Sequence, residues 1–174
     1  MEAWLRRFNL YLALAALTLL CGCQTDRQKE PAGVLRVYIE AGASNIGTAQ
    51  TISVVRSTPV LITVSREPIL TEANIAAAKV IDVPGGFALE IQFNQYGTRL
   101  LEQYSAANPG KHFAIFAQWG KKPVIGRWLA APIITHRISD GILSFNADIY
   151  SREETEQLAL SLNAVAKKLQ GASK

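Results

Sequence analysis

The pattern of apolar and polar positions predicts a series of short strands with helices between them. Apolar and polar residues alternate at 34–40 and 87–93, which is the period of a strand that buries one face. Residues 113–119 are apolar on both faces for most of their length, which is typical of a strand in the middle of a sheet. We also expect strands at 51–56, 59–65, 80–83, 123–127 and 142–149, and a short one that ends near residue 138.

Two segments in the middle of the chain carry helix-start signals, because short polar side chains there can accept an N–H of the first helical turn. We expect Thr71 to cap a short helix at 72–79. We expect Asn94 to cap a longer helix that ends near Ala107. On the longer helix, three large side chains at a spacing of four residues are expected to share one packed face: Tyr96, Leu100 and Tyr104.

The C-terminal helix is the most clearly marked element. Ser151 and Glu154 form a capping box, in which each side chain accepts the main-chain N–H of the other residue. The apolar residues of this helix then recur at spacings of four, three and four, at Leu158, Leu162, Val165 and Leu169. Together the elements predict one α+β domain at 34–170, a mostly antiparallel sheet with two main amphipathic helices packed on one face.

The first 22 residues have the pattern of a bacterial lipoprotein signal peptide. Two arginines precede 11 uncharged apolar residues at 10–20, a stretch that is short for a membrane span but typical of a signal peptide. The sequence Leu-Cys-Gly-Cys at 20–23 then resembles a lipobox. We therefore expect Cys23 to carry the lipid and to begin the mature protein, with 23–33 as a tether. An ordinary signal peptide or an uncleaved anchor is the alternative.

Composition narrows the class of protein. The chain has 174 residues, of which 49% are hydrophobic and 18% charged, so it is too apolar to be disordered. Its two cysteines both precede the predicted domain, which must therefore fold without disulfides. The net charge of +4 is scattered along the chain, which argues against a nucleic-acid partner. No run of about 18 uncharged apolar residues occurs, which excludes a polytopic membrane protein.

The sequence shows no arrangement of side chains that points to a reaction. His112 and His136 are the only histidines, and they lack further ligands at the spacing of a metal site. Asp140 and Asp148 are candidates for an acid–base pair, but Asp140 also fits its Asp-Gly turn without a catalytic role. No serine lies in a Gly-x-Ser-x-Gly elbow. We expect a protein that is not an enzyme and that uses neither a metal nor a cofactor.

The segment 126–137 is the best candidate for a binding surface. Trp128 lies in what the pattern predicts to be a loop, and a large aromatic side chain in a loop is often a contact residue. Packing of this tryptophan under the loop is the simpler alternative. The residues expected to bind a partner are Arg127, Trp128, Leu129, Pro132 and Ile133.

From Glu67 to the C-terminus, the order of several stretches resembles the periplasmic head subdomain of SecD, the accessory protein of the bacterial Sec translocon. The Ala-Pro-Ile stretch with its following glycine, before the capped C-terminal helix, is the most specific part of this resemblance. The matching stretches are Pro68–Thr71, Leu89–Phe93, Asn108–Lys111, Ala131–Ile133 and Ser151–Glu154.

The resemblance implies the fold of a SecD head and a surface near 126–137 that holds unfolded preprotein. It does not extend to the translocase motor, because SecD drives that motor through transmembrane helices that the pattern of this sequence does not predict. The expected function is therefore that of a non-catalytic lipoprotein of the bacterial envelope, which binds protein or peptide, including unfolded or exported proteins, with a domain in the periplasm. Gln24, directly after the lipidated cysteine, favours the outer membrane. The alternative is a structural or assembly lipoprotein that contacts a fixed envelope partner or itself.

Overall fold

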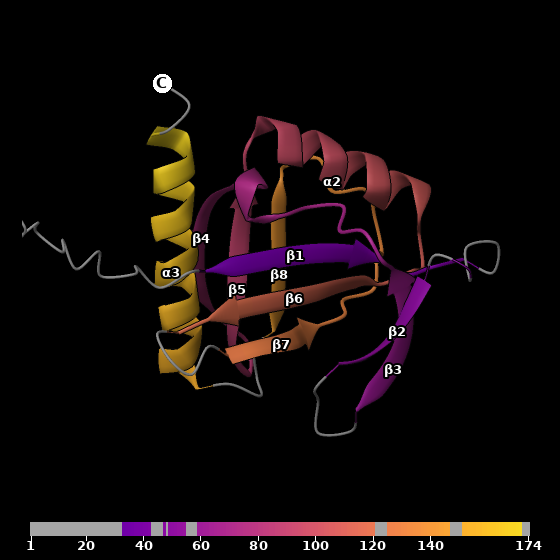
Figure 1. Ribbon diagram of the computed structural model, residues 1–174, viewed down its shortest axis with the longest axis horizontal. Coiled ribbons are helices and arrows are strands. Elements are labelled where there is room, and N and C mark those ends of the chain that lie inside the picture. Colours follow the sequence, from indigo (N-terminus) through magenta and orange to yellow (C-terminus); the bar gives the residue numbers. More distant parts are fainter. Residues whose placement is uncertain are drawn as a thin grey trace, which may run out of the picture.

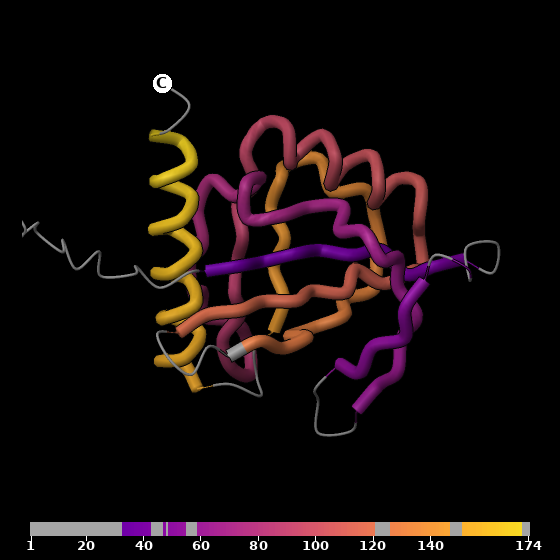
Figure 2. Tube along the Cα trace, viewed as in Figure 1, coloured from indigo at the N-terminus to yellow at the C-terminus, as the bar shows by residue number. Residues whose placement is uncertain are grey.

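Eight strands, two α-helices and one 3₁₀ helix form the part of the chain that the structure describes. The structure is a computed structural model, and the residues that it describes are 33–42, 47, 49–54, 59–120, 125–146 and 151–171. The predicted signal peptide, Cys23 and the tether before residue 33 lie outside these residues. Figure 1 labels the strands and helices, and Figure 2 traces the path of the chain.

Sheet A contains β1 (Val34–Ile39), β6 (Phe113–Trp119) and β7 (Ile125–Ala130), with β6 in the middle and both pairs antiparallel. The strand predicted at 34–40 and the central position predicted for 113–119 are confirmed. The central strand is apolar except for Gln118, because both of its faces are covered. One face borders the main core, and the other face borders a smaller group of apolar side chains.

Sheet B is the hairpin of β2 (Ala49–Val54) and β3 (Val60–Ser65), which projects from one end of sheet A (Figure 1). Its inward side chains cover part of the outer face of sheet A, and we call the resulting group the hairpin cluster. This cover is the reason that Tyr38 is buried, although the alternation in β1 predicts a polar face there. The buried members of the hairpin cluster are Tyr38, Ile52, Val54, Ile62, Val64, Ala114 and Ala131.

Sheet C contains β4 (Ile75–Val83), β5 (Gly86–Phe93) and β8 (Ile142–Asn146), with β5 in the middle. The strand predicted at 87–93 is confirmed, and the strand predicted at 142–149 is confirmed as far as residue 146, where the described range ends. The side chains that β5 turns inward pack against sheet A and form the main core. The largest fully buried members of this core are Trp119, Phe113, Leu35, Leu70, Ile75, Leu89, Ile91, Leu101, Ile115 and Leu162.

The helix predicted at 72–79 is wrong. Only Glu72–Asn74 forms a turn of 3₁₀ helix, η2, and β4 begins at the next residue. The main-chain N–H of Thr71 donates to Oδ1 of Asn74 at 2.9 Å, which closes this single turn. Three alanines at 76–78 favour a helix in isolation, but β4 pairs with β5 over nearly its whole length. Helix propensity is a weak preference, and pairing with a distant strand overrides it here.

Helix α2 (Gln95–Ala107) begins where the sequence predicts, since the N–H of Gly97 donates to Oδ1 of its cap, Asn94, at 2.9 Å. The face predicted to pack is wrong by one position, because Tyr96 is 56% exposed. Gly97 brings the helix close to η2 and to the end of β5, since a Cβ at this position would lie 2.9 Å from the Cβ of Asn74 and 3.0 Å from the Cβ of Phe93. The residues that α2 buries are Gly97, Leu101 and Ser105, whereas Leu100 and Tyr104 are only partly buried.

Helix α3 (Arg152–Gly171) has the capping box predicted for it. The N–H of Ser151 donates to Oε2 of Glu154, and the N–H of Glu154 donates to Oγ of Ser151, both at 3.1 Å. The helix packs along β4, with Leu158 and Leu162 buried in the main core. The last two residues of the apolar row predicted for this helix are less buried: Val165 is partly buried and Leu169 is exposed.

The predicted fold class, a single α+β domain with mostly antiparallel strands, is confirmed. The strands are divided among three sheets, where the sequence pattern alone predicted one. Figure 1 shows β1, β6 and β7 running across β4, β5 and β8, with α3 beside β4 and α2 along one end of the domain. Among the helices that the structure describes, none is both long enough and apolar enough to cross a membrane.

Candidate functional site

Trp128 lies in a strand and not in the loop that the sequence predicts. It belongs to β7 and stands opposite Phe116 in the register of sheet A. On the outer face of the sheet its ring contacts two others, with centroids 5.0 Å from Tyr38 and 5.4 Å from Phe116. The side chain is partly buried and packs against the hairpin cluster. Much of the tryptophan therefore serves packing, and only the rest of its surface is accessible to a partner.

The two neighbours of Trp128 in β7 do not share its surface. The register passes from Trp128 opposite Phe116 to Ala130 opposite Ile115, so Leu129 is the extra residue of an irregularity. Leu129 was expected to bind a partner, but it is 5% exposed and belongs to the main core. Its side chain is therefore not accessible to a partner. Arg127 is exposed. The three neighbouring residues that were expected to bind a partner, Arg127, Trp128 and Leu129, therefore do not form one continuous surface.

Pro132 and Ile133 lie in the segment that joins β7 to β8, and main-chain hydrogen bonds hold this segment against the start of β6. The N–H of Phe113 donates to the carbonyl of Pro132 at 3.0 Å, and the N–H of Ile134 donates to the carbonyl of Lys111 at 2.8 Å. The short strand expected to end near residue 138 is reduced to an isolated bridge at Ile133. Two stretches that carry the resemblance, Asn-Pro-Gly-Lys and Ala-Pro-Ile, thus meet in space.

A cavity of about 340 Å³, which we call the β8 cavity, lies between this segment and β8. Seven of the eleven described residues that line it are apolar, and Ile133 among them is 57% exposed. Among the described residues of its lining, the titratable side chains are His136 and Asp140. The apolar residues that line it are Phe113, Pro132, Ile133, Ile134, Ile138, Ile142 and Leu143.

The free edge of β8 borders the β8 cavity, because the lining includes residues of β8 and none of β5. The N–H of Phe93 donates to the carbonyl of Gly141 at 2.9 Å, which makes this a hydrogen-bonded pair. Such pairs alternate along an antiparallel ladder, so the main-chain groups of Ile142 and Ser144 point away from β5. The N–H of Ile142 accordingly donates to Oδ1 of Asp140 at 3.0 Å, outside the ladder.

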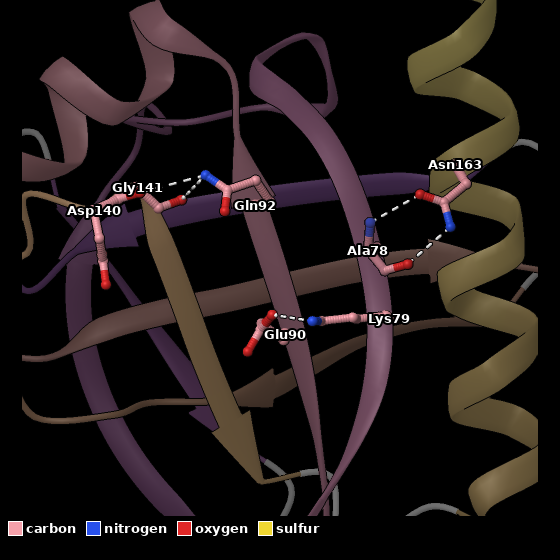
Figure 3. A network of polar contacts seen from close by, with 7 residues as sticks. All are labelled: Ala78, Lys79, Glu90, Gln92, Asp140, Gly141 and Asn163. Carbon is pink, nitrogen blue, oxygen red and sulfur yellow. Dashed lines mark hydrogen bonds and ion pairs between the residues drawn. The ribbon is translucent and has the colours of Figure 1, made fainter.

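The opposite edge of sheet C is closed by a side chain of α3. The N–H of Ala78 donates to Oδ1 of Asn163, and Nδ2 of Asn163 donates to the carbonyl of Ala78, both at 2.8 Å (Figure 3). One amide thus pairs with both main-chain groups of this residue of β4, as a neighbouring strand would. On the outer face of the same sheet, the ion pair between Lys79 and Glu90 links β4 to β5 at 3.0 Å.

The histidines and carboxylates of the described residues do not gather into a metal site. His112 contacts Glu40, with Nδ1 and Oε2 2.7 Å apart, at a second cavity of about 630 Å³ beside the hairpin. His136 lines the β8 cavity instead, so the two histidines belong to different surfaces. Within the described residues, no group of three or more metal-binding side chains lies close enough to hold an ion. Asp148, the partner considered for Asp140, lies outside them.

Two features of this region cannot be seen in the sequence. In the sequence, Asn163 is one polar residue among others on a helix, and nothing marks its contact with Ala78, which lies 85 residues away. The free edge of β8 depends on the order of the strands in sheet C, and the sequence pattern does not give that order. The Asp-Gly pair at 140–141 is the one local signal, because it marks the turn that begins β8.

Comparison with protein families identifies the domain. The model of the SecDF P1 head subdomain matches residues 49–166. The chain belongs to the SecDF P1 head family. The matched range begins with the hairpin β2–β3, before the stretches that carry the resemblance in the sequence, and it ends within α3. A comparison with curated proteins found no match.

One solved SecDF structure shares the fold of this head domain at low sequence identity. A SecDF described as a membrane component that enhances protein export has a TM-score of 0.54 and 21% identity, covering 81% of this chain and 69% of its own. SecDF in its super-membrane-facing form has a TM-score of 0.48 and 16% sequence identity. SecDF from Thermus thermophilus has a TM-score of 0.41 and 16% sequence identity. These two matches cover 91% and 92% of this chain, which spans 33% and 34% of theirs.

Proposed function

We propose that this protein is a non-catalytic lipoprotein of the bacterial envelope that binds segments of exported polypeptides with its SecDF head domain. The proposal places the lipid on Cys23, the domain in the periplasm and the anchor in the outer membrane, which Gln24 favours. Membership of the SecDF head family supports a link to protein export. The observation that carries the binding role is the β8 cavity, which is open to solvent and lined by apolar residues together with main-chain and side-chain polar groups.

In this proposal, Pro132 and Ile133 contact the client inside the β8 cavity. Covering the exposed part of Ile133 would stabilise the complex by about 1–2 kcal/mol, since full burial of such a side chain is worth about 1.5–3 kcal/mol. A few such contacts, set against the ordering of an unfolded chain, give weak and reversible binding. Arg127 and the exposed part of Trp128 provide a separate contact surface on β7.

The proposal is tested by titrating the full chain, purified in a mild detergent, with reduced and carboxymethylated α-lactalbumin as an unfolded client. Ile133→Ser should weaken binding about tenfold, the loss that corresponds to about 1.4 kcal/mol. The matched control is Leu160→Ser, because Leu160 is 68% exposed on α3 and lies outside the lining of the cavity. Trp128→Ala measures the separate surface on β7.

Equal affinities of the parent, Ile133→Ser and Leu160→Ser for the client would remove the β8 cavity from the proposal. If the folded parent binds no unfolded client, the binding role itself is wrong. The function would then be the structural or assembly role that was the alternative from the sequence. Co-purification of one fixed envelope protein, or stable self-association, would identify that role.

A further inference from the structure

The two edges of sheet C differ in whether they can accept another strand. At the edge formed by β4, the amide of Asn163 pairs with both main-chain groups of Ala78, and α3 packs along the strand. At the other edge, β8 ends the order of strands that the structure describes. There, the carboxylate of Asp140 accepts the N–H of Ile142. An open strand edge is a template for pairing with another extended chain.

The groups on the free edge of β8 have the spacing that a strand requires. The N–H and C=O of Ser144 and the C=O of Ile142 point away from β5, as the alternation of the ladder dictates. A strand about 4.8 Å from β8 would meet these groups with its own C=O and N–H groups. The side chain of Ser144 is exposed, so it does not cover this edge.

The β8 cavity provides the space beside this edge. It is bounded by β8 on one side and by the segment of Pro132 to Ile138 on the other, which Figure 2 shows running back alongside β8. Side chains of a strand point alternately to its two faces. Every second side chain of an added strand would therefore face the apolar residues of the lining, and the others would face solvent on the outer face of the sheet, beside Ser144, which stands opposite Glu90.

From these observations we infer that β8 binds an uncharged, extended segment of a client polypeptide by adding it to sheet C as an outer strand. This inference rests on the proposed function, because it states how the same client is held. Main-chain hydrogen bonds are alike for every sequence, so the site accepts many clients in which apolar residues alternate. Only His136 and Asp140 offer charge in the lining, so a charged segment loses its hydration there without adequate compensation.

The direct test uses two peptides that differ only in their main-chain N–H groups. The first is an acetylated and amidated peptide of alternating valine and threonine, about eight residues long, which is the length of an ordinary strand. The second is the same peptide methylated at every main-chain nitrogen, so that it keeps the side chains and cannot donate to β8. The full chain should bind the first peptide and bind the second at least about tenfold more weakly.

A matched pair of variants tests the edge from the side of the protein. Ser144→Pro removes the N–H that faces the free edge, and it leaves the ladder to β5 intact because that N–H takes no part in it. Ser144→Ala removes the hydroxyl and keeps the N–H. We expect Ser144→Pro to weaken binding of the unmethylated peptide about tenfold, while Ser144→Ala binds like the parent.

The possible results separate this inference from the proposed function. If both peptides bind alike, or if folded Ser144→Pro binds like Ser144→Ala, strand addition is wrong even where the unfolded client still binds. If neither peptide binds while carboxymethylated α-lactalbumin does, strand addition is also wrong. Self-association of the parent that Ser144→Pro abolishes would make a second copy the occupant and would overturn the inference. If Ser144→Pro does not fold, the binding of the two peptides to the parent decides whether β8 accepts a strand.

Discussion

Replacing Asn163 with leucine tests whether the closed edge of sheet C contributes to stability. The side chain of Asn163 makes two hydrogen bonds to Ala78, each of 2.8 Å, and Ala78 is 5% exposed. Leucine has a similar size and opens no large cavity, but it can neither donate nor accept. The N–H and the C=O of Ala78 would thus lose their partner at a position that water reaches poorly.

The expected cost follows from these two groups. A neutral hydrogen bond contributes about 1 kcal/mol, and a buried group left without a partner costs about 1–3 kcal/mol. The added apolar surface of leucine offsets part of this loss. We therefore expect Asn163→Leu to lower the free energy of unfolding by about 2–4 kcal/mol.

The measurement is urea unfolding followed by tryptophan fluorescence, to which Trp119 in the main core contributes. Gln157→Leu is the matched control, because Gln157 is an exposed polar residue of the same helix. The control should change stability by less than about 0.5 kcal/mol. If Asn163→Leu is as stable as this control, the amide does not close the edge in the way the geometry indicates, and the reasoning fails.

Three further predictions concern the lipid anchor, the main core and the close contact of α2. Intact mass of membrane-extracted protein should show a lipid on the residue that begins the mature chain, and Cys23→Ser should abolish the added mass while Cys21→Ser should not. Leu162→Ala should cost about 2–5 kcal/mol in thermal or urea unfolding, because Leu162 is buried in the main core, whereas Leu160→Ala should cost less than about 0.5 kcal/mol. Gly97→Ala should lower stability by about 1–3 kcal/mol, since its Cβ would lie 2.9 Å from a neighbouring Cβ, and an unchanged melting temperature would contradict that contact.

Local patterns in the sequence predicted the elements whose form is set by local rules. The alternation at 87–93 and the apolar run at 113–119 correspond to β5 and β6, because burial on one face or two leaves a period that can be read directly. The capping box of Ser151 and Glu154 is likewise a contact within one turn. These predictions depend on residues that are neighbours in the chain.

The predictions that failed depend on contacts between distant residues. The alanine-rich segment at 76–78 is a strand because β5 pairs with it, and no local signal competes with its helical composition. The packed face of α2 is set by Gly97, because the absence of a side chain there allows the close contact. A search for rows of apolar residues overlooks a glycine. Leu129 and Trp128 were grouped by their proximity in sequence, but a strand sends neighbouring side chains to opposite faces.

The pairing of β1 with β6 also constrains the order in which the domain can fold. Val34 pairs with Gln118 and Ile39 pairs with Phe113, so the first strand of the domain waits for a partner that follows only after β2 to β5 and α2. The hairpins β2–β3 and β4–β5 join strands that are adjacent in the chain, and such local pairs form sooner than distant ones. In pulsed hydrogen exchange during refolding, we therefore expect the amides of β4 and β5 to become protected before those of β1. A chain that emerges from a membrane with its N-terminus first would hold β1 without its main strand partner until β6 has followed it.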